Sequence, residues 1–124
     1  GPQDVSNTAW AFARLRERDV PVFRTLSVAG SHGLKRFSTQ HVVNTAWAFA
    51  MVTFEDRPFL DELWDQALHR VPQFTTQHLS NTAWAMARLL AAHEPLLGAL
   101  SSAVAQRSPE CAPRELANSA WALG

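Results

Sequence analysis

Hydrophobic and polar positions in the middle of the chain recur with the period of an α-helix. One face of the predicted helix carries Leu60, Leu63, Trp64, Ala67, Leu68 and Val71. This spacing of three and four residues is typical of a helix with one buried face. The opposite, polar face carries Asp61, Glu62, Asp65 and His69. We predict that this helix opens at Pro58, because the fixed φ of proline suits the first helical position.

The same pattern predicts a helix just before it. Ser38 is a favourable N-cap, and the apolar spacing that follows predicts a helix from about residue 39 to 53. A short polar loop that ends at Arg57 separates the two helices. The segment from 38 to 74 is therefore predicted to be a helical hairpin.

The hairpin pattern repeats along the chain. The tetrad Asn-Thr-Ala-Trp, or a near copy of it, recurs every 37 residues, at Asn7, Asn44, Asn81 and Asn118. A constant period of this size indicates stacked supersecondary units, none of which buries a core alone. Equivalent helix starts are marked by Pro2, Pro21, Thr75, Pro95 and Pro113.

We therefore predict an all-α fold, an α-solenoid of helix-turn-helix units. The single array over residues 1–124 divides into units at about 1–37, 38–74 and 75–111, with 112–124 as the first helix of a fourth, about seven helices in all. We expect the chain to be a fragment of a longer solenoid, with its ends covered by further repeats or partner chains. The second helix of the first unit and the second helix of the third unit should be irregular, because glycine and serine interrupt them. These residues are Gly30, Ser31, Gly33, Gly98, Ser101 and Ser102.

The repeated tetrad places unusual residues inside a helix. Asparagine prefers caps and turns, so in mid-helix it needs a hydrogen-bond partner. We expect the tryptophans to wedge between successive units, with an acceptor for each indole N–H. An alternative is an exposed aromatic ladder that stacks on bases, which requires bare ring faces. The structural motif comprises Asn7, Trp10, Asn44, Trp47, Asn81, Trp84, Asn118 and Trp121.

Composition excludes several classes of protein. No apolar stretch approaches the ~20 residues of a membrane-spanning helix, so we predict no membrane span. Cys111 is the only cysteine, which excludes an internal disulfide. The formal net charge is zero, so there is no strong attraction toward a polyanion. Cations outnumber acids before residue 40, whereas the second unit is acidic.

Two segments resemble a known repeat. Residues 74 to 89 read Phe-Thr-Thr-Gln-His-Leu-Ser-Asn-Thr-Ala-Trp-Ala-Met-Ala-Arg-Leu, and residues 113 to 123 read Pro-Arg-Glu-Leu-Ala-Asn-Ser-Ala-Trp-Ala-Leu. Both are similar to the first helix of the octotricopeptide repeat (OPR), which is related to the helical-repeat part of FAST-kinase-like proteins. Thr39 and Thr76 depart from its proline, and His41 and His78 depart from its acid.

The resemblance covers nearly the whole chain and implies an α-solenoid that binds RNA in chloroplasts or mitochondria. Members also serve as structural subunits of large organellar assemblies. If first helices line the binding surface, their early polar residues and the residue before each asparagine are the candidates to contact single-stranded RNA. Alternatively, first-turn polar groups merely accept from free helix N–H groups. The candidates are Gln3, Asp4, Ser6, Gln40, His41, Val43, Gln77, His78, Ser80, Arg114 and Glu115.

Catalysis finds little support in the sequence. His41 and His78 lie one unit apart on helices ~8–10 Å from each other, too far to share one metal ion. No glycine-rich phosphate loop or nucleophile elbow occurs. We predict a non-catalytic module without metal or cofactor.

Two functions remain open. One is the binding of single-stranded organellar RNA through first-helix side chains. The other is a scaffold role, in which the solenoid grips proteins of a ribosome or of a photosynthetic or respiratory complex. The organellar location follows from the resemblance alone, and we expect the targeting segment to lie outside this chain.

Overall fold

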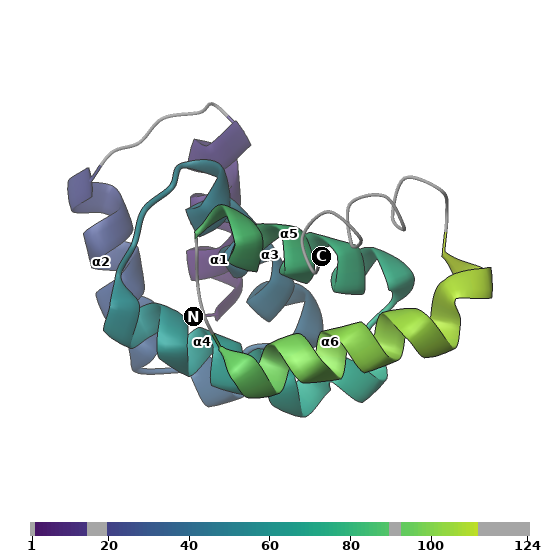
Figure 1. Ribbon diagram of the computed structural model, residues 1–124. Helices are drawn as coiled ribbons and strands as arrows, with labels where there is room; N and C mark the ends of the chain where they lie inside the picture. Colours follow the sequence, from purple (N-terminus) through teal and green to yellow (C-terminus); the bar gives the residue numbers. More distant parts are fainter. Residues whose placement is uncertain (1, 15–19, 90–92, 112–124) are drawn as a thin grey trace.

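The computed structural model describes residues 2–14, 20–89 and 93–111, which form an all-α fold without strands (Figure 1). The described α-helices are α1 (Pro2–Arg14), α2 (Val20–Ser31), α3 (Thr39–Met51), α4 (Arg57–Arg70), α5 (Thr76–Arg88) and α6 (Glu94–Arg107). Short 3-10 helices over Leu34–Arg36, Val71–Gln73 and Ser108–Glu110 follow α2, α4 and α6. The predicted first helix of a fourth unit lies outside the described residues.

The helices lie in two layers (Figure 1). In the first layer α3 contacts both α1 and α5, and in the second α4 contacts both α2 and α6. Each first-layer helix also packs against the helix that follows it in the chain. First-layer helices begin at residues 2, 39 and 76, and second-layer helices at 20, 57 and 94. Segments at equivalent places in the sequence pattern are therefore neighbours in space.

The core lies between the two layers and along the contacts within each. On α4 the predicted apolar face is buried at Leu60, Leu63, Trp64 and Ala67. On α3 the alanines at 46, 48 and 50 are buried, so the neighbouring helices approach closely. Full burial of each large aliphatic or aromatic side chain stabilises the fold by about 1.5–3 kcal/mol.

Capping boxes begin the second and third first-layer helices. The hydroxyl of Ser38 accepts from the His41 N–H at 3.1 Å, and His41 Nδ1 accepts from the Ser38 N–H at 3.4 Å. Thr75 and His78 repeat this arrangement, with 3.1 Å for both bonds. The predicted N-caps at Ser38 and Thr75 are confirmed, and histidine replaces the usual acid of the box.

The caps of the second-layer helices also connect neighbouring helices. Asp56 accepts from the Phe59 N–H at 3.3 Å to cap α4, and its other oxygen accepts from the Ser27 hydroxyl of α2 at 2.8 Å. His93 Nδ1 accepts from the Leu96 N–H at 3.2 Å, and its Nε2 lies 2.8 Å from an Asp65 oxygen on α4. Each cap thus stabilises its own helix and connects it to the neighbouring helix of the second layer, α4 to α2 and α6 to α4.

Helix α3 ends at Met51, two residues earlier than the apolar spacing predicts. The Phe54 N–H donates to the Phe49 carbonyl and the Thr53 N–H to the Ala50 carbonyl, the two bonds of a Schellman motif. Thr53 adopts the left-handed conformation, with φ of 53°, where glycine is usual. The Phe49 and Phe54 rings pack edge to face at 5.8 Å, which holds this turn in place.

The predicted irregularity of α6 is wrong. The helix runs without a break through Gly98, because Leu96 and Leu100 are fully buried and hold that segment against the core. By contrast, α2 does stop at Ser31, ahead of Gly33, whereas α4 continues to Arg70 at the place equivalent to Gly33. Packing therefore overrides the weak helix propensity of α6, whereas glycine shortens α2.

The glycines of α2 and α6 should respond to alanine in opposite directions. A Cβ at Gly30 would lie 2.8 Å from Cε1 of the buried Phe59 ring, whereas one at Gly98 would meet nothing within 4 Å. We expect Gly30→Ala to lower the free energy of unfolding by about 1–3 kcal/mol through overpacking. Gly98→Ala should raise it by about 0.5–1 kcal/mol, because alanine is the better helix former. Urea unfolding of both variants measures this, and a stabilising Gly30→Ala would contradict the close approach of α2 and α4.

Candidate functional site

Amide and indole side chains form a repeated row on the first layer. On each helix a glutamine, an asparagine and a tryptophan follow at spacings of four and three residues, so they share one helix face. None of these side chains belongs to the fully buried core. We call this surface the amide–indole face; it consists of Gln3, Asn7 and Trp10 on α1, Gln40, Asn44 and Trp47 on α3, and Gln77, Asn81 and Trp84 on α5.

The tryptophans differ from the expectation that all of them are trapped between units. Trp10 is 42% exposed, so the expectation is wrong for this residue. Trp47 and Trp84 are half-buried and pack against the edge of the core. The deeply buried indole is instead Trp64 of α4, which is 1% exposed. Trp121 and Asn118 lie outside the described residues.

The two middle residues of the repeated tetrad, threonine and alanine, are buried in α3 and α5. Thr45, Ala46, Thr82 and Ala83 are buried. Thr45 donates its hydroxyl hydrogen bond to the His41 carbonyl at 2.7 Å, which satisfies the buried oxygen. A helix turns about 100° per residue, so burying threonine and alanine brings the flanking asparagine and tryptophan to the accessible side.

Three of the residues predicted to contact RNA are buried. Ser6, Val43 and Ser80 precede the asparagines, and at most 2% of each is exposed. They lie on the inward side of the first-layer helices, so they cannot touch a ligand on the surface. This corrects the expectation that the residue before each asparagine reads a base. Among the other candidates, Gln3, Asp4, Gln40 and Gln77 are exposed, and Arg114 and Glu115 lie outside the described residues.

His41 and His78 are half-buried and engaged in the capping boxes. His78 also bridges two first-layer helices, because its Nε2 lies 3.0 Å from Oε1 of Gln40. Gln40 in turn donates through Nε2 to Oδ1 of Asn44 at 2.9 Å. Asn44 therefore has the hydrogen-bond partner that an asparagine in mid-helix was expected to need. The structure thus brings together three predicted site residues from two adjacent helices.

Arg88 extends the amide–indole face at the end of α5. Its guanidinium lies 5.5 Å from the centre of the Trp84 ring, and its Nε donates to the Ala50 carbonyl of α3 at 2.9 Å. The side chain is exposed, so it presents a cation beside an accessible indole. The sequence pattern did not single out Arg88, because its partners are a backbone carbonyl and a neighbouring side chain.

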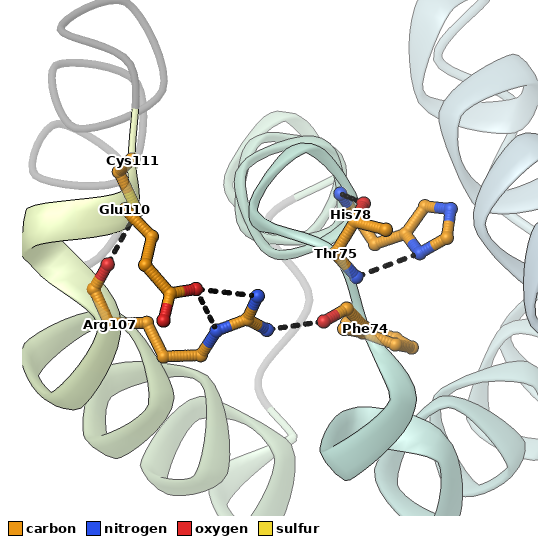
Figure 2. A network of polar contacts seen from close by, with 6 residues as sticks. All are labelled: Phe74, Thr75, His78, Arg107, Glu110 and Cys111. Atoms are coloured by element: carbon orange, nitrogen blue, oxygen red, sulfur yellow. Dashed lines mark hydrogen bonds and ion pairs between the residues drawn. The ribbon is translucent and has the colours of Figure 1, made fainter.

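Two further arginine contacts anchor the starts of α3 and α5. Arg70 donates to the Phe37 carbonyl, directly before the Ser38 cap. Arg107 reaches the Phe74 carbonyl in the same way, and Figure 2 shows it spanning from α6 to the segment ahead of α5. Glu110 holds the Arg107 guanidinium through two bonds of 3.1 Å. These contacts set the position of the first turns, from which the amide–indole face begins.

Burial lowers the pKa of His78 from its ordinary value of 6.5. Well above pH 6.5 both the folded and the unfolded chain hold this histidine neutral. As the pH falls below 6.5, the unfolded chain binds the proton first, so stability is lost until the folded pKa is passed. Protonation of Nδ1 also removes the acceptor for the Thr75 N–H.

We therefore expect the free energy of unfolding to fall between about pH 7 and pH 5, and His78→Gln to reduce this fall. A glutamine amide can accept and donate in place of the imidazole without titrating in this range. Urea unfolding of both proteins at the two pH values measures the difference. An identical pH dependence in the wild type and the variant would contradict a role for His78.

The rest of the described surface offers less chemistry. The outer side of α4 is acidic, with Asp61, Glu62 and Asp65 exposed. Within residues 2–14, 20–89 and 93–111, no three histidine, cysteine or acidic side chains are grouped as metal ligands would be. None of the helices in these ranges is both long and apolar enough to cross a membrane.

The fold and surface define an all-α protein of paired helices with a repeated amide–indole face. Comparison with models of known protein families and with curated proteins gives no match.

Proposed function

We propose that the chain is a non-catalytic α-solenoid module with a 37-residue period that binds single-stranded RNA through the amide–indole face. The supporting observation is the alignment of the same three residue types on three adjacent helices. Indole faces stack on bases of any sequence, and amides pair with base edges. The proposal agrees with the resemblance to the octotricopeptide repeat, and that resemblance is the basis on which we propose a location in a chloroplast or mitochondrion.

The charge distribution favours the first layer over the second as the RNA-binding side. Arg88 lies on the amide–indole face, whereas the exposed side of α4 carries three carboxylates that would repel phosphates. With a net charge of zero, few phosphates are neutralised, so stacking supplies much of the affinity. We expect binding that weakens with salt, but with a shallow slope.

Titration of a short fluorescein-labelled RNA of random sequence tests the proposal. We expect binding at low salt and quenching of tryptophan fluorescence. Trp10→Ala should weaken binding about 5- to 100-fold, the effect of losing one stacked base. Val28→Ala on α2 is the matched control, because it truncates another exposed apolar residue outside the face. Absence of binding by the wild type at low salt would overturn the proposal.

A second candidate function rests on the exposed side of α2. A groove of about 510 Å³ is lined there by Pro21, Arg24, Thr25, Val28 and Ala29. Val28 is 56% exposed, which favours a protein contact at this place. A structural subunit of a large organellar complex would use such a surface. In that case Val28→Asp abolishes incorporation into the complex while Trp10→Ala does not. If instead Val28→Asp leaves incorporation intact and Trp10→Ala weakens binding to RNA, the result supports RNA binding.

A further inference from the structure

A chain of four hydrogen-bonding groups crosses from α5 to α3. The Thr75 N–H donates to His78 Nδ1 at 3.1 Å, and His78 Nε2 lies 3.0 Å from Gln40 Oε1. Gln40 Nε2 donates to Asn44 Oδ1 at 2.9 Å. The chain begins at a backbone N–H, which is always a donor, and ends at a half-buried side chain of the amide–indole face.

The fixed donor at one end determines the direction of every other bond. Because His78 Nδ1 accepts from a backbone N–H, a neutral His78 carries its proton on Nε2 and must donate to Gln40. Gln40 therefore turns its oxygen toward His78 and its amino group toward Asn44. Asn44 then accepts through Oδ1, which leaves its amino group, with two N–H donors, for a ligand. The amide orientation follows from the bonding partners and is not an arbitrary choice.

We propose that this series of hydrogen bonds makes Asn44 selective between bases. It favours uracil and guanine, which carry a carbonyl group, over cytosine and adenine, which carry an amino group at the same position of the ring. The inference rests on the proposed RNA binding and adds the class of base. An amide that is free to rotate can pair with adenine through both its oxygen and its amino group. The bond from Gln40 occupies the Asn44 oxygen on one side and fixes the orientation of the amide, so the amino group is the part of Asn44 left without a partner for a ligand. A carbonyl oxygen accepts from it, whereas an amino group meets a second donor.

The equivalent positions on α5 provide a natural comparison. Gln77 and Asn81 occupy the same places on the amide–indole face, yet no hydrogen bond joins them within the described part of the chain. Asn81 is therefore free to present either side of its amide. Gln40 is thus a positioning residue whose effect depends on the histidine that faces it.

Binding of oligo(U) and oligo(A) to the wild type, Gln40→Ala and Gln106→Ala tests the proposal. The quantity compared is the ratio of the Kd for oligo(A) to the Kd for oligo(U). Stacking of oligo(A) on itself is the same in every titration, so it cancels when variants are compared. We expect Gln40→Ala to lower this ratio about fivefold or more, because Asn44 can then rotate. Gln106→Ala, at an exposed glutamine of α6 outside the amide–indole face, should leave the ratio unchanged.

Asn44→Asp provides a second, independent readout. A carboxylate still accepts from Gln40 but offers only an acceptor to the ligand, so this variant should favour amino-bearing bases and bind oligo(C) better relative to oligo(U). Circular dichroism verifies that all variants are folded. If the wild type binds neither RNA, the proposed function and this inference both fall. If it binds both and neither Gln40→Ala nor Asn44→Asp alters the ratios, only the selectivity of Asn44 is overturned.

Discussion

Replacing Phe49 by alanine is expected to lower the free energy of unfolding by about 3–5 kcal/mol. The Phe49 side chain is fully buried in α3, at the centre of an aromatic cluster. Its ring centre lies 5.1 Å from that of Phe23 on α2, 5.1 Å from that of Phe59 on α4, and 5.8 Å from that of Phe54 in the loop between α3 and α4. Truncation removes these contacts and leaves a cavity that rigid helices fill only in part.

The location of Phe49 makes this effect more than a local one. The cluster joins the first helical pair to the second, and neither pair alone buries a sufficient core. Urea unfolding followed by circular dichroism measures the loss. Val28→Ala, on an exposed site of α2, is the control and should change stability by less than about 0.5 kcal/mol. Equal losses in the two variants would contradict the packing described for Phe49.

The second large effect is expected for Arg70→Ala, at about 1.5–3 kcal/mol. The guanidinium of Arg70 donates to the Phe37 carbonyl at 2.5 Å and to the Gln66 carbonyl and side chain at 2.9 and 2.7 Å. Burial lowers the pKa of Arg70, but a guanidinium remains charged in proteins. Alanine leaves the Phe37 carbonyl without this donor and detaches the end of α4 from the start of α3.

Arg57→Ala is the matched control for Arg70→Ala. Arg57 lies 3.8 Å from Glu55, and about half of each side chain is exposed, so the loss should stay between about 0 and 1 kcal/mol. Arg70→Lys should recover only part of the stability, because an ammonium group cannot reproduce the forked contacts of a guanidinium. Unfolding midpoints of the three variants decide the matter. An Arg70→Ala loss no larger than that of Arg57→Ala would show that the carbonyl contact contributes little.

The Arg70 contact also bears on the proposed RNA-binding surface. Arg70 and its counterpart Arg107 position the first turns of α3 and α5, and those turns carry Gln40 and His78. Loss of either anchor should therefore loosen the hydrogen-bond chain that orients Asn44. The amide–indole face thus depends on contacts made on the opposite layer of the molecule.

Helix starts were predictable because their signals are local. Ser38 and Thr75 satisfy N–H groups three residues away, and the proline at 58 sits in the first turn of α4. The end of α3 was not predictable in this way. It depends on Thr53 adopting a conformation unusual for its residue type, held by the packing of Phe54 on Phe49.

The candidate site was predictable only in its residue types. The recurring asparagine and tryptophan marked the first helices as special, and the glutamine of the first turn was among the candidates. Which side of each helix faces outward was not decided by the tetrad, since Val43 and Ser80 are buried while Trp10 is exposed. Contacts such as Arg70 with the Phe37 carbonyl leave no trace in a sequence, because every residue supplies the same acceptor.

Residue order alone thus specified an all-helical chain, the starts of its helices and the recurrence of its motif, because caps, proline and apolar periodicity act over a few residues. Tertiary structure decided the rotation of each helix, the burial of Trp64 rather than Trp10, and the direction of the bonds from Thr75 to Asn44. Those features arise from groups on different helices, and their free energies depend on distances that are set only when the layers pack.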